Sequence, residues 1–236
     1  MSKAIILGSA VEDLFAGDEK IVAENRYGSV EMAKRGDTYY IFRHKKGHAE
    51  LPHQVNYKAN VYELKELGVS KVVTTYAVGS VSEKLLPTHI GLVGDFIDFS
   101  FMARDYTFFD EDKSLMRHVD MTDIFDFNMS MKALESASRL NITLTPNLVY
   151  AVTNGPRFET KAEIKALSRL GSDVVGMTLS PEIPLIKELE IPVLSLCFSI
   201  NWAAGLDEEG LSFVEHESMV KICADVLEIA ENVLED

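Results

Sequence analysis

Residues 148–200 read LVYAV, TNGPRFETKAEIKALSRLGS, DVVGM, TLSPEIPLIKELEI and PVLSLCFSI, so that apolar runs alternate with segments of helical character. The first helical segment places Ile164, Leu167 and Leu170 on one face, and the second has Pro181 in its first turn, where proline is favoured. Short apolar runs separated by amphipathic helices are typical of a mixed or mostly parallel sheet covered by helices. We therefore predict an α/β fold.

The same alternation extends over most of the chain. Leu134, Ala137 and Leu140 form another helical stripe, and Glu215–Leu234 has the apolar spacing of an amphipathic helix that packs on the sheet. The stretch Phe99–Phe127 is irregular and rich in aromatic residues, and we expect a long excursion there, beside a binding site or at a subunit contact. Further strand-like runs lie at Lys3–Leu7, Thr38–Phe42, Lys71–Thr75 and Ile90–Ile97.

Length and composition indicate a single domain over residues 1–236, with a central mixed sheet flanked by helices. Hydrophobic residues make up 47% of the 236 residues and charged residues 25%, which is enough to bury one large core. We find no linker, low-complexity tract or internal repeat in the sequence. A division into two domains is therefore not expected.

The composition also disfavours several classes of protein. The net charge of −14 argues against nucleic acid or an anionic membrane as a partner, because such contacts need basic surfaces. No stretch approaches the roughly 20 apolar residues that span a bilayer, and the N-terminal sequence lacks a secretory signal, so we expect a cytoplasmic protein. Cys197 and Cys223 lack the spacing and neighbours of a zinc site, and we expect two buried, reduced thiols and no metal.

A basic segment, residues 43–48, follows a predicted strand in this acidic chain. Arg43 could bind an anion such as phosphate in a forked geometry, and His44 could add a further donor; a solvated basic loop is the alternative interpretation. Ser9 and Thr178 each follow another predicted strand and would supply hydroxyl groups at the same rim of the sheet. These residues together predict an anion site.

The loop that follows the run LVYAV has the features of a site for a flat ring. Gly155 and Pro156 mark a sharp turn, and Phe158 offers a flat apolar face for a base. Glu159 and Asn201 supply the opposite hydrogen-bonding characters that the edge of a purine requires. These features suggest a pocket for a purine nucleoside.

Ordered motifs that bear on function are spread along the chain, at Ile5–Ser9, Arg43-His44, Pro52–Asn60, Ala77-Val78-Gly79, Gly155–Glu163, Gly176-Met177-Thr178 with Pro181-Glu182, and Asn201. With them, almost the whole chain resembles the purine nucleoside phosphorylase and 5′-methylthioadenosine phosphorylase family, in its trimeric branch. The resemblance implies the nucleoside phosphorylase fold and a homotrimer or a dimer of trimers. It also implies that inorganic phosphate is a co-substrate and that neither a metal nor an organic cofactor is needed.

The resemblance assigns one group of residues to phosphate and another to the nucleoside. The stretch Leu7-Gly8-Ser9-Ala10 departs from the family pattern, because Gly-Gly-Thr-Gly is common there in the methylthio branch. Tyr76 also departs from it, because Asn or Thr is common at this position near phosphate and ribose. The implied phosphate contacts are Ser9, Arg43, His44, Thr178 and the backbone of Ala77. The implied nucleoside contacts are Met177 under the ribose, Phe158 on the base, and Glu159 and Asn201 at the edges of the base.

Three further positions bear on the choice of substrate. His216 resembles a histidine that contacts the 5′-hydroxyl in nucleoside-specific members, and Ala203 lies where adenine-using members often carry Asp. His118 resembles a residue that family members insert into the site of the neighbouring subunit. These likenesses imply a 6-oxopurine nucleoside such as inosine or guanosine, bound at a site shared between subunits.

The expected chemistry agrees with these residue types. Cleavage of an N-glycosidic bond develops positive charge at the anomeric carbon and negative charge on the leaving purine, and bound phosphate can serve as both anion and nucleophile. In a 6-oxopurine, Glu159 could accept the N1 hydrogen while the Asn201 amide donates towards N7 or O6. We expect Asn201, Glu159 and His44 to be the catalytic residues of a purine nucleoside phosphorylase.

Other functions remain open at this point. The motifs around Gly176-Met177-Thr178 and Asn201 also resemble those of 5′-methylthioinosine phosphorylases, and a 5′-methylthioadenosine phosphorylase is a related alternative. A non-catalytic nucleoside-binding module on the same fold is an alternative of another class, which the retained Arg43, His44 and Thr178 disfavour. The G-x-G-x-x-G fingerprint is missing after the first strand, so an NAD-linked oxidoreductase is a poorer interpretation.

Overall fold

The centre of the molecule is a nine-stranded sheet, counted over the residues that the structure describes. The structure is a computed structural model, and it describes residues 1–8, 12–45, 49–100, 107–110, 116–207 and 210–235. The strands lie in the order β2-β3-β4-β1-β5-β8-β7-β6-β9, and β9 also pairs with β5. They are β1 (Ser2–Leu7), β2 (Lys20–Asn25), β3 (Gly28–Arg35), β4 (Thr38–Phe42), β5 (Val69–Ser80), β6 (Ile90–Asp98), β7 (Leu144–Val152), β8 (Val174–Gly176) and β9 (Val193–Trp202).

Five of the strands pair in a closed ring, and the other four extend from it as an open sheet. Because β5 pairs with both β8 and β9, the strands β5, β8, β7, β6 and β9 close on themselves, while β1, β4, β3 and β2 extend outward from β5. β1 runs parallel to β4 and β5, and β5 runs parallel to β9, whereas β5 with β8 and β6 with β9 are antiparallel. The sheet is therefore mixed, as the sequence predicted.

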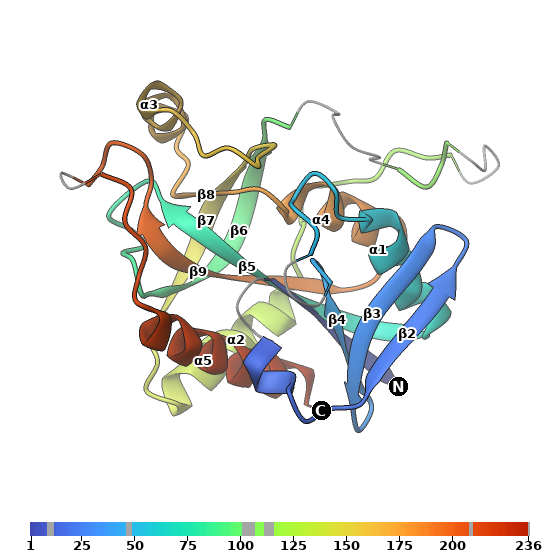
Figure 1. Cartoon of the computed structure of the whole chain (residues 1–236). Helices are drawn as coiled ribbons and strands as arrows, with labels where there is room; N and C mark the ends of the chain where they lie inside the picture. Colours follow the sequence, from blue (N-terminus) through green and yellow to red (C-terminus); the bar gives the residue numbers. More distant parts are fainter. Residues whose placement is uncertain (9–11, 46–48, 101–106, 111–115, 208–209, 236) are drawn as a thin grey trace.

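Helices cover both faces of this sheet (Figure 1). On one face, α2 and α5 pack with strand residues such as Leu194 and Leu196 in a single buried cluster. On the other face, α1 and α4 contribute Val61, Leu64 and Ile183 to a second cluster. The helices are α1 (Tyr57–Glu66), α2 (Phe127–Arg139), α3 (Lys161–Arg169), α4 (Leu179–Glu188) and α5 (His216–Leu234), with a short 3₁₀ helix at Glu12–Phe15.

The ends of the helices are fixed by local hydrogen bonds. The Asn56 side chain caps α1 by accepting from the Ala59 amide at 3.0 Å. Thr160 and Glu163 form a reciprocal capping box at the start of α3. This box fixes where the loop after β7 ends and α3 begins.

Four parts of the fold differ from the sequence prediction. The hairpin of β2 and β3 was not expected; its first strand alternates exposed and half-buried residues, and Val22 is 62% exposed, so its apolar signal is weak. Helix α1 was also not expected, and β5 continues beyond Thr75 to Ser80 because its ladder with β9 continues there. Leu170 is 58% exposed and lies just after α3 rather than on its buried face.

Both cysteines, Cys197 and Cys223, are buried as predicted, and neither forms a disulfide bond. Burial raises the pKa of the Cys223 thiol to about 12 and raises that of Cys197 as well. Within the described ranges, no helix combines the length and apolar character needed to cross a membrane. In the same part of the chain, no three His, Cys, Asp or Glu side chains gather in a cluster that could hold a metal ion.

Candidate active site

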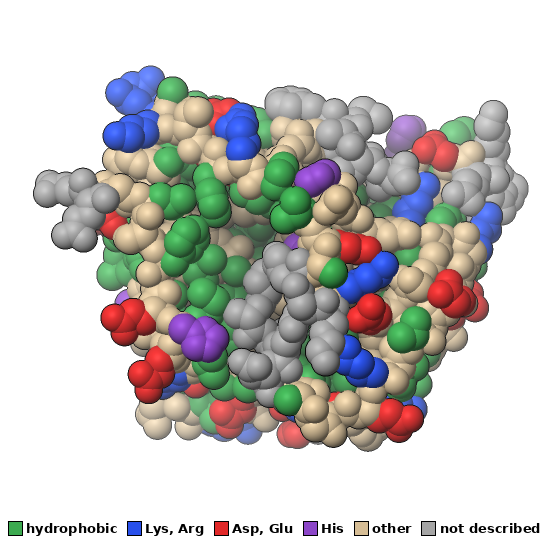
Figure 2. All heavy atoms as spheres, viewed as in Figure 1, with side chains coloured by type: hydrophobic (Ala, Val, Ile, Leu, Met, Phe, Trp, Pro, Cys, Tyr) green, Lys and Arg blue, Asp and Glu red, His purple; other side chains and the backbone are tan. Residues whose placement is uncertain are grey.

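A pocket of about 240 Å³ lies where the late residues of six strands and their following loops meet. Gly8 follows β1, Arg43 follows β4, and Glu159 lies in the loop after β7. Parts of β5, β8 and β9 complete the wall, as expected for ligand sites at the carboxyl ends of strands in α/β sheets. Figure 2 shows hydrophobic side chains gathered around a hollow in this face of the molecule. The predicted site residues in the lining are Arg43, His44, Ala77, Phe158, Glu159, Met177, Thr178, Asn201 and Ala203.

Arg43 is the most deeply buried charged residue of this lining, with 1% of its surface exposed. Its Nε and Nη2 donate to the two carboxylate oxygens of Glu182, each at 2.7 Å, and its Nη1 donates to the Thr75 carbonyl at 2.9 Å. Burial alone would lower the pKa of Arg43, but the charge and hydrogen bonds of Glu182 raise it above its ordinary value. The guanidinium therefore stays positively charged at one end of the pocket.

His44 and Thr178 lie at the same end of the sheet as Arg43. His44 Nδ1 lies 2.8 Å from the Glu50 carbonyl, and because a carbonyl can only accept, Nδ1 carries the proton. Thr178 occupies the cap position before α4, yet its side chain makes no capping hydrogen bond. One pocket is thus lined by a buried guanidinium, an imidazole and a hydroxyl group. These groups can together bind an oxyanion such as phosphate.

Glu159 and Asn201 line the pocket from the β7 loop and from β9. The Thr153 hydroxyl donates to Glu159 Oε1 at 2.5 Å, which holds one carboxylate oxygen in place. Asn201 lies opposite Gly79 in the β5–β9 pairing, and its Nδ2 donates to the Trp202 carbonyl at 2.7 Å. A Cβ on Gly79 would lie 3.3 Å from that Nδ2, so glycine gives the Asn201 amide its space.

The rest of the lining is apolar. Gly155 has a φ of 59°, which glycine adopts without strain, and this turn brings Phe158 to the mouth of the pocket, where it is 47% exposed. The Phe158 ring lies 5.7 Å from the ring of Phe213, a residue on the segment before α5. Leu51 and Leu211 border the same space. A flat ring can therefore be bound between apolar side chains and the polar groups of the strand ends.

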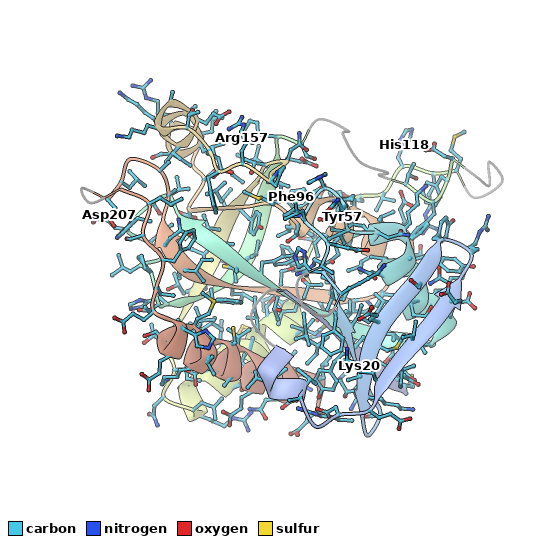
Figure 3. All side chains as sticks on the ribbon, in the orientation of Figure 1. Lys20, Tyr57, Phe96, His118, Arg157 and Asp207 are labelled. Atoms are coloured by element: carbon cyan, nitrogen blue, oxygen red, sulfur yellow. The ribbon has the colours of Figure 1, made fainter. Side chains whose placement is uncertain are left out.

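Four predicted site residues are not part of this lining. Tyr76 is fully buried behind the wall, with its hydroxyl donating to Glu182. His216 is exposed at the start of α5. His118 borders a separate, wider groove next to the start of α2, and Figure 3 shows it well to the side of Arg157. Ser9 lies outside the described residues.

Two polar residues with a clear place beside the pocket had no assigned role in the sequence analysis. Glu182 is fully buried and binds Arg43, and its position in the apolar run LSPEIPLI was the available signal, since an acidic residue there needs a buried partner. Thr153 binds Glu159, but threonine in a loop is too common to predict this contact. Both residues orient side chains that do line the pocket.

Comparisons with known proteins agree with this architecture. The chain is 38% identical over 224 residues to the "Probable 6-oxopurine nucleoside phosphorylase" of Thermococcus kodakarensis, with 90% of this chain and 83% of that protein covered. It is 40% identical over 215 residues to the "Probable S-methyl-5′-thioinosine phosphorylase" of Methanopyrus kandleri, with 89% and 82% covered.

A solved structure has the same fold over nearly its whole length. Methylthioadenosine phosphorylase from Schistosoma mansoni in complex with tubercidin superimposes with a TM-score of 0.85 at 27% identity, covering 100% of this chain and 93% of that chain. The sequence model of the family described as the Phosphorylase superfamily matches residues 4–235. A match over almost the entire chain, together with relatives at this level of identity, establishes the family, and the chain belongs to the phosphorylase superfamily.

Proposed function

We propose that this protein catalyses the phosphate-dependent cleavage of 6-oxopurine nucleosides, such as inosine and guanosine, into free purine and ribose 1-phosphate. Its membership of the phosphorylase superfamily makes it an enzyme of the pentosyltransferase type. The observation that carries the proposal is a single pocket that combines the anion-binding groups of Arg43, His44 and Thr178 with the polar pair Glu159 and Asn201. The name of the relative from Thermococcus kodakarensis supports it.

The reaction follows from the charges that these groups can stabilise. A phosphate oxygen forms a bond to the anomeric carbon while the bond from that carbon to purine N9 breaks, and its electron pair passes to the purine. Arg43, His44 and Thr178 would hold phosphate next to the ribose, so that the attack takes place within one complex. Donors at the purine stabilise the negative charge that develops on it.

Glu159 and Asn201 would select the base and assist its departure. Thr153 occupies Glu159 Oε1, so Oε2 is the oxygen that would accept the N1 hydrogen of a 6-oxopurine. The second N–H of the Asn201 amide would donate towards N7 or O6, since the first binds the Trp202 carbonyl. Donation to N7 strengthens as charge builds on the leaving base, which is what a catalytic contact requires. Phe158 would pack on the base.

Several properties of the enzyme belong to the same proposal. Inorganic phosphate would be its co-substrate, and neither a metal nor an organic cofactor takes part in the steps described above. We propose a homotrimer in which His118 approaches the site of a neighbouring subunit, as the family resemblance implies. We also propose the cytoplasm as its compartment, where the buried thiols of Cys197 and Cys223 stay reduced.

Phosphorolysis of 5′-methylthioinosine is the second candidate function. It is favoured by the apolar side chains of Leu51, Phe158 and Leu211 around the pocket and by the position of His216 outside the lining, because a methylthio group needs no hydrogen-bond partner. The name of the relative from Methanopyrus kandleri supports this alternative. Both candidates require the same phosphate and base contacts and differ only at the 5′ end.

Base release measured by chromatography tests the proposal. Inosine, guanosine, adenosine, 5′-methylthioinosine and 5′-methylthioadenosine are each incubated with the enzyme, with and without phosphate. We expect phosphate-dependent release confined to the 6-oxopurines. Whether the nucleoside with a 5′-hydroxyl or the one with a 5′-methylthio group is cleaved faster decides between the two candidates. Release without phosphate, or preferential cleavage of the 6-aminopurines, contradicts the proposal, and binding without any cleavage supports the nucleoside-binding module.

A further inference from the structure

Arg43, Glu182 and Tyr76 form a buried cluster directly behind the pocket wall. Glu182 accepts from Arg43 with both carboxylate oxygens, and Oε1 also accepts from the Tyr76 hydroxyl at 2.7 Å. The Cζ atom of Arg43 lies 4.4 Å from the centre of the Tyr76 ring. All three side chains are almost completely buried, so water does not weaken these contacts.

The cluster leaves Arg43 with a limited capacity to bind anything else. A guanidinium has five N–H groups, and three of those of Arg43 are donated to Glu182 and to the Thr75 carbonyl. Within the part of the chain that the structure describes, the other two, one on each terminal nitrogen, are the ones with which Arg43 can bind a ligand in the pocket that it lines. The carboxylate of Glu182 therefore competes with any anion in the pocket for the same cation.

The Tyr76 hydroxyl weakens this competition. By donating to Oε1 it takes up part of the negative charge of Glu182, so less of that charge is directed at Arg43. Burial and the nearby Glu182 raise the pKa of Tyr76 well above its ordinary value, so the hydroxyl keeps its proton and remains a donor. Tyr76 itself does not reach the pocket.

We propose that Tyr76 is a positioning residue that sets the affinity of this enzyme for phosphate, by sharing the Glu182 carboxylate with Arg43. This inference rests on the proposed function, because it takes phosphate as the ligand of Arg43. Without the Tyr76 hydroxyl, Arg43 is the one side chain among the described residues that still donates to Glu182. Glu182 then binds Arg43 more strongly and leaves it a weaker phosphate ligand. The nucleoside contacts at Glu159 and Asn201 are not affected.

The test is the substitution Tyr76→Phe, which keeps the ring against Arg43 and removes only the hydroxyl. We expect the KM for phosphate to rise roughly five- to tenfold, which is less than the full effect of losing one hydrogen bond to a charged group, because the lost bond acts on phosphate only through Glu182 and Arg43. The KM for inosine and the kcat at saturating phosphate should stay within about twofold of the wild type. The smaller phosphate affinity should also appear without nucleoside, as a smaller rise in melting temperature on addition of inorganic phosphate.

Tyr40→Phe is the matched control. The Tyr40 hydroxyl donates to Glu231 at 2.7 Å, so the same kind of bond of the same length is lost, but at α5 and away from Arg43. We expect no change in the KM for phosphate in this variant. An unchanged phosphate KM in Tyr76→Phe, or an equal rise in both variants, overturns the inference. A wild-type enzyme without phosphate-dependent base release overturns the proposed function instead, so the two failures are distinguishable.

Discussion

Replacement of Glu159 by glutamine should change the preferred base of the enzyme. In the wild type, the Thr153 hydroxyl donates to Oε1 at 2.5 Å and leaves the other carboxylate oxygen for the purine. In Glu159→Gln, Thr153 continues to donate to the remaining amide oxygen, so the new NH₂ group is turned towards the base. This donor then faces the N1–H donor of a 6-oxopurine, whereas N1 of adenine is an acceptor.

The size of the effect follows from the burial of this contact. Glu159 is only 9% exposed, so the loss of a hydrogen bond to its charge costs about 1.5–3 kcal/mol, and two opposed donors cost about 1–3 kcal/mol more. Even a total of about 3 kcal/mol lowers kcat/KM for inosine roughly 150-fold. Binding of adenine should be weakened much less, or strengthened.

Steady-state kinetics with inosine at saturating phosphate measure the fall in kcat/KM. Inhibition constants of hypoxanthine and adenine measure how strongly each base binds. Glu163→Gln is the matched control: this carboxylate lies four positions further along the chain, is half-exposed, and binds Arg157 and the Thr160 amide outside the pocket. Its substitution should leave kcat/KM unchanged. An equal fall in the affinity for hypoxanthine and adenine in Glu159→Gln would refute the assigned contact with N1.

Three further predictions concern base choice, acid stability and the buried ion pair. Asn201→Asp should move the preference from inosine towards adenosine by at least about tenfold, because a carboxyl group can accept from the 6-amino group; an unchanged ratio of the two kcat/KM values contradicts this contact. The hydrogen bond from Arg157 lowers the pKa of Glu163 from 4.5 to about 2, so the carboxylate stabilises the folded protein above its unfolded pKa, and this contribution is lost as the pH falls towards about 2. Melting temperatures over that range should therefore fall less in Glu163→Gln than in the wild type, and parallel curves would exclude the effect. Glu182→Ala should reduce the free energy of unfolding in urea by about 3–5 kcal/mol, because it leaves the charge of Arg43 buried without its partner; a loss below about 1 kcal/mol would show that water reaches the pair.

The parts of the fold that the sequence predicted are those with strong local patterns. The run Thr38–Phe42 is a strand with the same bounds as predicted, and α5 begins one residue after the predicted Glu215. In the β2–β3 hairpin, β2 alternates exposed and half-buried residues and has little apolar signal, whereas β3 buries Val30, Met32 and Ala33, which the sequence analysis did not use. In α1, the spacing of Tyr57, Val61 and Leu64 after Asn56 was a helical signal that the sequence analysis did not use.

The candidate site was predictable where it depends on motifs and not where it depends on long-range pairing. The positions of Arg43 and Thr178 after predicted strands already placed them at one rim of the sheet; in the structure, Arg43 directly follows β4 and Thr178 lies two residues after β8. The pairing of Arg43 with Glu182 joins residues that are 139 positions apart in a chain with 37 acidic residues, and nothing in the sequence selects that partner. The course of the segment before α5, which leaves His216 at the surface, is likewise a product of tertiary packing.

The closed ring of β5, β8, β7, β6 and β9 has a consequence for motion. A pocket between two halves of an open sheet can widen by a hinge movement, but strands that are hydrogen-bonded all the way round cannot separate unless a ladder breaks. The strand residues Gly79, Gly176 and Asn201 therefore form a rigid floor. Among the described residues, the loops that border the pocket carry Leu51, Phe158 and Leu211. We expect the movements that admit a nucleoside and release a purine to occur in these loops and not in the sheet beneath them.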